Sequence, residues 1–285
     1  MAQEKAVIEV PDLIVRTGEA PELRLQVRSA GFFGQGIGGE VVSVRAGKWE
    51  GSALTGEGGW GRLALPRLPE GVHELRASLA STRRYSARPA TGVAAFWPLR
   101  RPWAVVVLEG AAAPAKREAL PIGSVGVGPP RDGAPDGFRR LSSTHAVVVL
   151  TRRSERSRAE IRAWLDEHKF PAVPVVFLSG EPGSGEGASA DLKAWLAERR
   201  KEGRRLSVGI AERREDLHAF LDAGLRAVRI GEGGKIPEKA RRVPTWKDVR
   251  KEVPQRSRLD TVRSERPESV RVLPAIFGDR RIGTM

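Results

Sequence analysis

The chain of 285 residues contains no cysteine, and this absence excludes several classes of site. Disulfide bonds, thiolate zinc sites, iron–sulfur clusters and cysteine nucleophiles all require that side chain. Histidine is scarce as well, because the chain has four histidines and no two of them have the i, i+4 spacing of a helical zinc pair. A histidine-rich metalloenzyme therefore has no support in the sequence.

Long apolar runs are also absent. No segment approaches 18 consecutive apolar residues, and the first residues, MAQEKAVIEVPDL, contain no apolar leader segment. We therefore expect a cytoplasmic protein without a transmembrane segment.

Two glycine-rich segments look like phosphate-binding loops but lack what such loops need. GQGIGG, at positions 34–39, is followed by the strand pattern EVVSVRAG, whereas a dinucleotide fingerprint leads into a helix. GEPGSGEG, at positions 180–187, has Glu186 and Gly187 where a P-loop has Lys and then Ser or Thr. A G-x-S-x-G motif is absent, so a serine hydrolase has no support either.

Positive charge is present in excess, with 49 Lys and Arg against 35 Asp and Glu, a net charge of +14. Residues 240–285 alone contain 12 Lys and Arg against 6 Asp and Glu. Such a basic tail can bind nucleic acid, an anionic membrane surface or an acidic protein partner. Because arginine is abundant along the whole chain, a solvated arginine-rich surface explains the same numbers, and both interpretations stay open.

Residues 1–100 show the pattern of an all-β domain. Short segments of alternating apolar and polar residues, such as LRLQVRS, EVVSVRAG and HELRASLAS, are separated by turn sequences such as GEGG and LPEG. We expect a small antiparallel sandwich that resembles the immunoglobulin-like accessory domains of bacteria.

Residues 101–253 show a different pattern. Apolar runs, among them WAVVVLEG, HAVVVLT, RLSVGIA and RAVRIG, alternate with amphipathic helical stretches. This alternation predicts a parallel sheet with crossover helices, and therefore a three-layer α/β domain. We expect residues 254–285 to be a third segment, a basic and partly extended tail.

The α/β part resembles the haloacid dehalogenase-like (HAD-like) superfamily and, within it, the lipin-type phosphatidate phosphatase domain. The resemblance covers Trp103 to Val253 and rests on four motifs: WAVVVLEGAAA, HAVVVLTRRSE, ADLKAWL and SVGIAERREDLHAFLDAGL. It implies a Rossmann-like fold and phosphoryl transfer. In active members a first strand ends in Asp-x-Asp-x-Thr, a second ends in Ser or Thr, a helix supplies Lys, and a last motif binds Mg²⁺.

The first motif departs from that pattern at both catalytic positions. Glu109 stands at the nucleophile position and Ala111 at the general acid/base position. Alanine transfers no proton, and general acid–base catalysis contributes about 10²–10⁴-fold in rate. Glutamate is one methylene longer than aspartate, and a displacement of about 1 Å can cost 10²-fold. The motif therefore predicts a silent site.

The resemblance also implies phosphate-binding residues on the second and third motifs. Thr151 matches the hydroxyl that holds a phosphate oxygen, and Arg153 matches the arginine that follows it. Lys193 matches the helix lysine, for which Lys201 is an alternative. A strand-end hydroxyl that bonds to nearby backbone is an equally good interpretation of Thr151.

A residual magnesium site is implied by three carboxylates. Glu109, Glu212 and Asp216 stand where the resemblance places metal ligands, and hard cations bind clustered carboxylate oxygens. Three solvated carboxylates at strand ends explain the same residues, and we favour that interpretation. We expect no cofactor, or Mg²⁺ if the domain is active.

The sequence thus predicts a catalytically silent phosphatase-like protein that binds a phosphorylated or anionic ligand, a membrane surface or a protein partner. One alternative is an active Mg²⁺-dependent phosphatase of the phosphatidate phosphatase type with an atypical site. A second alternative is a nucleic-acid-associated protein that uses the basic tail.

Overall fold

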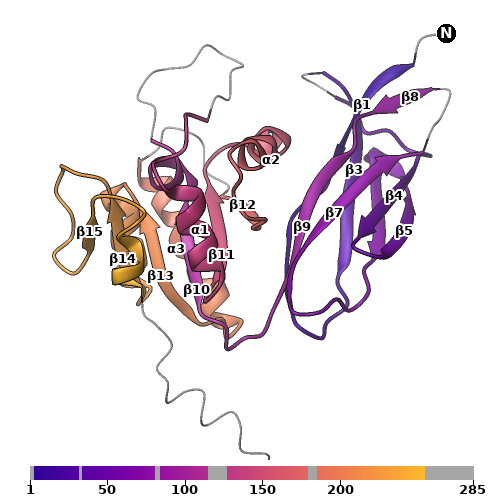
Figure 1. Cartoon of the computed structure of the whole chain (residues 1–285). Helices are drawn as coiled ribbons and strands as arrows, with labels where there is room; N and C mark the ends of the chain where they lie inside the picture. The colour runs from indigo at the N-terminus through magenta and orange to yellow at the C-terminus, as the bar shows by residue number, and fades with distance from the viewer. Residues whose placement is uncertain (1–2, 32–33, 81–83, 115–126, 179–184, 254–285) are drawn as a thin grey trace, which may run out of the picture. The chain divides into compact units, whose positions relative to one another are not determined.

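The computed structural model describes residues 3–31, 34–80, 84–114, 127–178 and 185–253. The predicted tail, 254–285, lies outside the described residues. The described residues form an all-β part followed by an α/β part, and the chain passes from one to the other between Trp97 and Trp103 (Figure 1). The predicted domain boundary at residue 100 lies within this connection. That the two parts are separate domains stays a prediction.

The all-β part consists of a four-stranded and a five-stranded sheet. The first has the order β6-β3-β1-β8 and is built from β1 (Glu4–Glu9), β3 (Glu22–Ser29), β6 (Trp60–Ala64) and β8 (Tyr85–Ala87). The second has the order β2-β9-β7-β4-β5 and is built from β2 (Leu13–Arg16), β4 (Val41–Ala46), β5 (Trp49–Leu54), β7 (Gly71–Leu79) and β9 (Ala90–Trp97). A short 3-10 turn, η1 (Glu57–Gly59), precedes β6.

The alternating pattern of the strands produces one core between the two sheets. Leu23 and Leu25 of β3 are fully buried in the same hydrophobic cluster as Val42 and Val44 of β4. The predicted all-β region is thereby confirmed, and GQGIGG leads into strand β4 rather than into a helix.

Most strand pairs of this part are antiparallel, as expected, but two pairs are parallel. Strand β1 pairs with β8 in parallel, and β2 pairs with β9 in parallel. The physical reason is that β1 and β2 belong to different sheets and so form no hairpin with each other: β1 lies between β3 and β8, and β2 forms the edge of its sheet beside β9.

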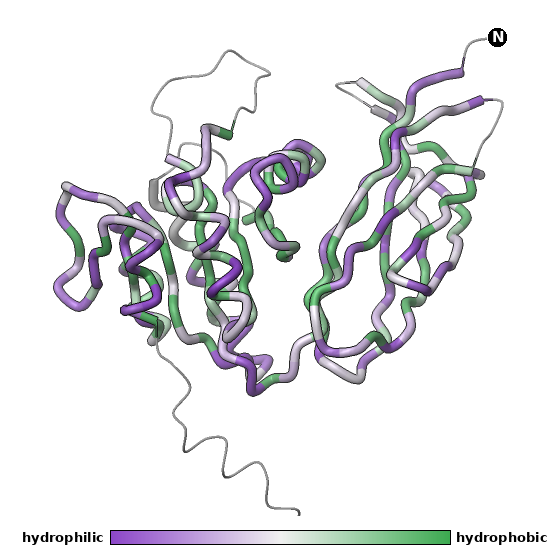
Figure 2. The backbone as a smooth tube through the Cα atoms, in the orientation of Figure 1, coloured by the Kyte–Doolittle hydropathy of each residue, from purple (hydrophilic) through white to green (hydrophobic). Residues whose placement is uncertain are grey.

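The α/β part contains one six-stranded sheet in which all pairs are parallel. Its order is β12-β11-β10-β13-β14-β15, and the strands are β10 (Trp103–Val107), β11 (Ala146–Thr151), β12 (Val175–Phe177), β13 (Leu206–Ala211), β14 (Arg226–Ile230) and β15 (Arg241–Val243). Every residue of β10 and β11 is buried. Apart from Thr151 at the end of β11, both strands are continuously apolar rather than alternating, as is typical of strands covered on two faces (Figure 2).

Helices cover both faces of this sheet. The longer ones are α1 (Ala134–Ser142), α2 (Arg158–Glu167), α3 (Gly185–Lys201) and α4 (Arg214–Asp222), with a 3-10 turn η3 (Glu155–Ser157) before α2 and a short α5 (Val249–Glu252) at the end. Apolar residues of α1, α2 and α5 share one core cluster with the sheet, and those of α3 and α4 share another. The predicted three-layer α/β part is confirmed. No helix among the described residues is long and apolar enough to cross a membrane.

Candidate functional site

The carboxyl ends of β11, β10 and β13 lie next to one another in the sheet. After β10 the chain builds outward through β11 to β12 and then returns to the other side of β10 as β13. The strand order therefore reverses between β10 and β13, and ligands of open α/β sheets bind at such switch points. Three motifs of the sequence, those ending β10, β11 and β13, meet at this edge.

The chain makes a tight turn, η2 (Leu108–Ala112), where β10 ends. The N–H of Ala113 donates to the carbonyl of Leu108 at 3.1 Å, and the N–H of Gly110 donates to the carbonyl of Ala113 at 2.6 Å. Gly110 has a φ of +90°, and a Cβ at this position would lie 2.5 Å from Cβ of Glu212. Glycine is therefore required here both by the backbone conformation and by the close approach of the β13 loop.

We expect Gly110→Ala to destabilise the native state by about 1 to 3 kcal/mol, because it adds overpacking against Glu212 to the strain of a positive φ. Gly18→Ala is the matched control, since Gly18 has a φ of +95° and a Cβ added there would meet no heavy atom within 4 Å. Urea unfolding of both variants separates the two contributions. Equal losses in the two variants would show that the contact with Glu212 contributes nothing.

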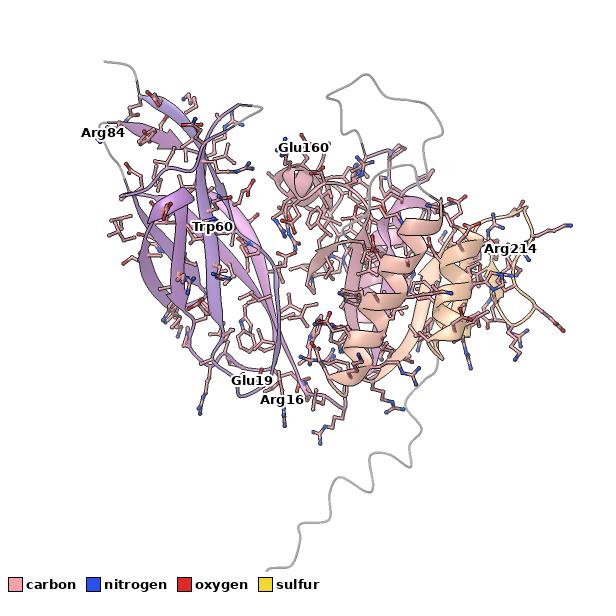
Figure 3. All side chains as sticks on the ribbon, turned by 180° about the vertical axis from the view of Figure 1, so that it is seen from behind. Arg16, Glu19, Trp60, Arg84, Glu160 and Arg214 are labelled. Carbon is pink, nitrogen blue, oxygen red and sulfur yellow. The ribbon has the colours of Figure 1, made fainter. Side chains whose placement is uncertain are left out.

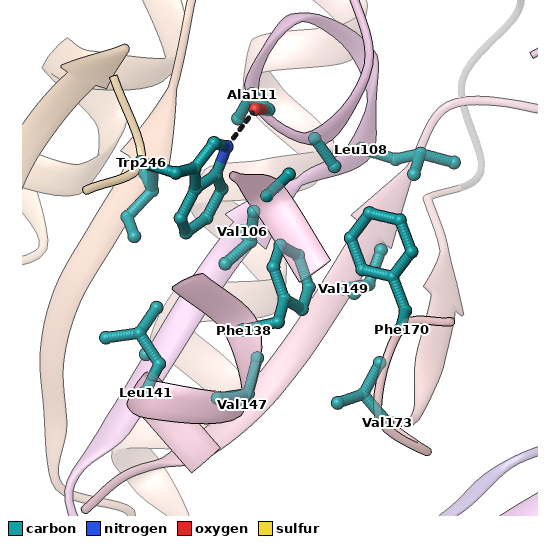
Figure 4. Close-up of a cluster of buried hydrophobic side chains, with 14 of the residues drawn as sticks. Val106, Leu108, Ala111, Phe138, Leu141, Val147, Val149, Phe170, Val173 and Trp246 are labelled. Carbon is teal, nitrogen blue, oxygen red and sulfur yellow. Dashed lines mark hydrogen bonds between the residues drawn. The ribbon is translucent and has the colours of Figure 1, made fainter. Parts of the chain in front are cut away.

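The three alanines after Gly110 are buried and belong to the core. Trp246 donates its indole N–H to the carbonyl of Ala111 at 2.9 Å, and the backbone N–H of Arg131 donates to the carbonyl of Ala112 at 2.8 Å (Figure 4). Ala111 has no exposed surface and shares the cluster of Phe138. The predicted acid/base position is thus a methyl group packed in the core, and small residues allow the turn to be buried.

Glu109 and Thr151 contact each other directly. The hydroxyl of Thr151 donates to Oε1 of Glu109 at 2.5 Å, and the backbone N–H of Arg152 donates to Oε2 at 3.4 Å. Nε of Arg153 lies 3.5 Å from Oε1 of the same carboxylate. The structure therefore joins the predicted nucleophile position to two predicted phosphate-binding residues, with no space between the carboxylate and the hydroxyl.

Arg152, which the sequence motifs did not single out, pairs with Asp216. Both guanidinium Nη atoms bond to the carboxylate of Asp216, with a distance of 3.2 Å for Nη1 to Oδ2. The Asp216 side chain is only 1% exposed and that of Arg152 12%. Burial raises the pKa of the Asp216 carboxyl above its ordinary value, while the charge and hydrogen bonds of Arg152 oppose that shift.

The third carboxylate has its own arginine. Nη2 of Arg131 lies 3.1 Å from Oε2 of Glu212, and Nε of Arg131 donates to the carbonyl of Gly110. Arg131 comes from the segment before α1, which the sequence motifs do not include. In the sequence, Arg131 is a charged residue in a glycine- and proline-rich stretch. Such a stretch does not indicate which side chain the arginine contacts.

The cluster therefore consists of three arginines and three carboxylates in separate pairs, and its formal charges cancel. Within the described residues, no group of three or more His, Cys, Asp or Glu side chains could hold a metal ion. Each of Glu109, Glu212 and Asp216 is engaged by an arginine in this arrangement, and the residual magnesium site that the resemblance implies stays a prediction.

Lys193 pairs with a carboxylate outside this cluster. Its Nζ lies 2.9 Å from Oδ2 of Asp222 at the end of α4, and both side chains are more than half exposed. This contact gives no support to a role of Lys193 in phosphate binding, and that role stays a prediction. An exposed pair of this kind contributes little free energy.

Comparison with known proteins gives little further information. No family model matches the chain, and no curated protein matches it. Among solved structures, a carbohydrate acetylesterase from Xanthomonas citri is 9% identical, with a TM-score of 0.35 over 85% of this chain and 72% of that chain. A family 39 glycoside hydrolase from Bacteroides cellulosilyticus is 10% identical, with a TM-score of 0.22 over 78% of this chain and 50% of that chain. These likenesses assign neither a family nor a chemistry to the strand-end cluster.

Proposed function

We propose that this chain is a catalytically silent phosphatase-like protein of the HAD-like type, which acts as a binding or scaffold protein. The observation that carries the proposal is the contact between Thr151 and Glu109, with 2.5 Å between their oxygens. In phosphoryl transfer the nucleophile and the hydroxyl ligand must hold the phosphoryl group between them. Here the two groups bond to each other instead.

The surroundings of this contact support the same conclusion. Ala111 offers no proton-transfer group and is packed in the core, where its carbonyl accepts from Trp246. Asp216 is engaged by Arg152, and Glu212 by Arg131, so each carboxylate is neutralised by a protein cation. Such a network positions the ends of β10, β11 and β13 relative to one another. This structural role does not require catalytic activity.

The ligand class follows from the charges that a binding partner would meet. Arg131 and Arg153 keep 20% and 25% of their side chains exposed beside the strand ends. A phosphorylated or otherwise anionic ligand, or an acidic protein surface, has the charge to bind these groups in competition with the carboxylates. No metal ion is needed for this function.

We expect the protein to release no more phosphate from para-nitrophenyl phosphate or phosphatidate than its Glu109→Gln variant does, with Mg²⁺ or with EDTA. The reason is that the wild type has no acid/base group at position 111 and no space for a phosphoryl group between Glu109 and Thr151. Phosphate release should be followed over hours at equal protein concentration. Mg²⁺-dependent release that disappears in Glu109→Gln would show a working phosphatase and would contradict the proposal.

A further inference from the structure

The outer face of the four-stranded sheet carries an exposed tryptophan beside two opposed arginines. In the antiparallel pair of β3 and β6, Arg24 lies opposite Arg62 and Gln26 lies opposite Trp60. The neighbours of Arg24 on β3, Leu23 and Leu25, are fully buried. Since side chains alternate between the faces of a sheet, Trp60, Arg24 and Arg62 all point outward. We call these three residues the Trp60 face.

The ring of Trp60 is exposed and lies beside the turn that precedes β6. The residue is 53% exposed, and Figure 3 shows it on the β-sandwich. Gly58 of the adjacent turn lies against the ring, because a Cβ on Gly58 would be 3.3 Å from Cδ1 of Trp60. Gln26 fixes that turn by donating from Nε2 to the carbonyl of Gly58 at 2.8 Å. A large apolar ring is therefore presented to solvent beside a turn that Gln26 holds.

The charges around the ring favour an anionic partner. Like charges directly opposite each other destabilise a sheet, yet Arg24 and Arg62 occupy such positions. Arg24 is paired only loosely, with 3.8 Å between its Nε and Oε1 of Glu22, and both side chains are more than half exposed. Within the part of the chain that the structure describes, Arg62 forms no ion pair with a carboxylate.

We propose that the Trp60 face binds single-stranded nucleic acid without sequence preference. A base would stack on the Trp60 ring, and a phosphate would bind between Arg24 and Arg62. Two residues along a strand span about 7 Å, so the ring and the Arg62 position are separated by about the reach of one nucleotide. Stacking on an aromatic ring next to cations is the usual basis of such binding, and the net charge of +14 attracts a polyanion to the molecule.

The test uses the full chain and a fluorescent oligothymidylate of about 20 nucleotides, longer than one binding site, with affinity measured by anisotropy at several salt concentrations. We expect Trp60→Ala to weaken binding by about 5- to 150-fold, since stacking contributes about 1–3 kcal/mol per base, and Trp60→Phe to retain most of the affinity. Arg24→Gln combined with Arg62→Gln should reduce the slope of log affinity against log salt by about 0.7, because the two arginines together bind one phosphate.

Two exposed residues of the other sheet serve as matched controls. Leu54 is 66% exposed on β5, and Arg76 is exposed on β7. Leu54→Ala and Arg76→Gln should leave the affinity unchanged.

Absence of oligonucleotide binding would overturn the proposal. Binding that Trp60→Ala does not weaken would overturn it as well, and would indicate that the basic tail binds the oligonucleotide instead. Heparin binding with the same dependence on Trp60 would also overturn it, since an acidic polysaccharide would then be the partner. None of these three results bears on the silent phosphatase site.

Discussion

Replacing Asp12 with alanine is expected to destabilise the native state by about 3 to 5 kcal/mol, because it breaks a buried ion pair. Asp12 lies between β1 and β2, and its side chain is 1% exposed. Its carboxylate accepts from the backbone N–H of Val93 at 2.8 Å, from the N–H of Val175 at 2.7 Å and from Nη2 of Arg162. Arg162 is itself 6% exposed.

The size of the effect follows from what the substitution leaves behind. Without the carboxylate, Arg162 keeps a buried positive charge whose remaining bond is from Nη1 to the carbonyl of Val173 at 2.8 Å. Two backbone donors, on β9 and β12, lose their acceptor at the same time, and each unsatisfied buried donor costs about 1–3 kcal/mol. A buried charge without its partner is the more expensive consequence.

Urea unfolding measures this loss, and the exposed pair of Arg45 and Glu50 supplies the control. Its atoms are 3.0 Å apart, but the side chains are 68% and 51% exposed, so Glu50→Ala should cost no more than about 1 kcal/mol. Asp12→Ala combined with Arg162→Met should cost less than the two single changes together, because it removes the unpaired charge. A loss below about 1 kcal/mol for Asp12→Ala would contradict the prediction, since it would mean that water or another group replaces the carboxylate.

Arg152→Met is expected to cost about 3 to 5 kcal/mol at neutral pH, because it leaves the Asp216 carboxylate buried without its cation. The neighbouring Arg213 gives the matched control. Nε of Arg213 lies 3.6 Å from Oε2 of Glu215, and these side chains are 38% and 54% exposed. Arg213→Met should therefore change stability by less than about 1 kcal/mol.

The pH dependence of the Arg152→Met variant has a defined sign. Burial raises the pKa of Asp216 in the wild type, and removal of Arg152 takes away the groups that oppose this rise. A carboxyl with a raised native pKa contributes stability below its unfolded pKa of about 3.9, and this stability is lost as pH rises through the native pKa. The destabilisation by Arg152→Met should thus be larger at about pH 8 than at about pH 5, as measured by urea unfolding. A loss that grows toward acid pH would show that Asp216 is not the group responsible.

Periodicity predicted the layers of the molecule from local information. Each residue of β10 and β11 is buried because helices cover both faces of the sheet, and this leaves a continuous apolar run in the sequence. The alternating apolar and polar residues of 1–100 predicted the all-β part, because each strand buries one face and exposes the other. The pairing of β1 with β8 was not predictable in this way, because alternation reports which face is buried and not which neighbour a strand has.

The candidate site was predictable in part. Parallel strands bring their carboxyl ends to one edge, so motifs that end neighbouring strands placed Glu109, Thr151 and Glu212 in the same region. The sequence did not reveal that Thr151 bonds to Glu109, or which of the two successive arginines pairs with which carboxylate. Side-chain direction at a strand end depends on the path of the following loop, and residue order does not contain that path.

The sequence by itself determined the fold class, the absence of thiol chemistry and the lack of a proton-transfer group at Ala111. Only the tertiary structure brought Arg131 to Glu212, Trp246 to the carbonyl of Ala111, and Asp12 to Arg162. The physical reason is the range of the interactions. Burial patterns repeat over a few residues along one element, whereas these contacts join residues 81 to 150 positions apart, and they form only when the whole chain has packed.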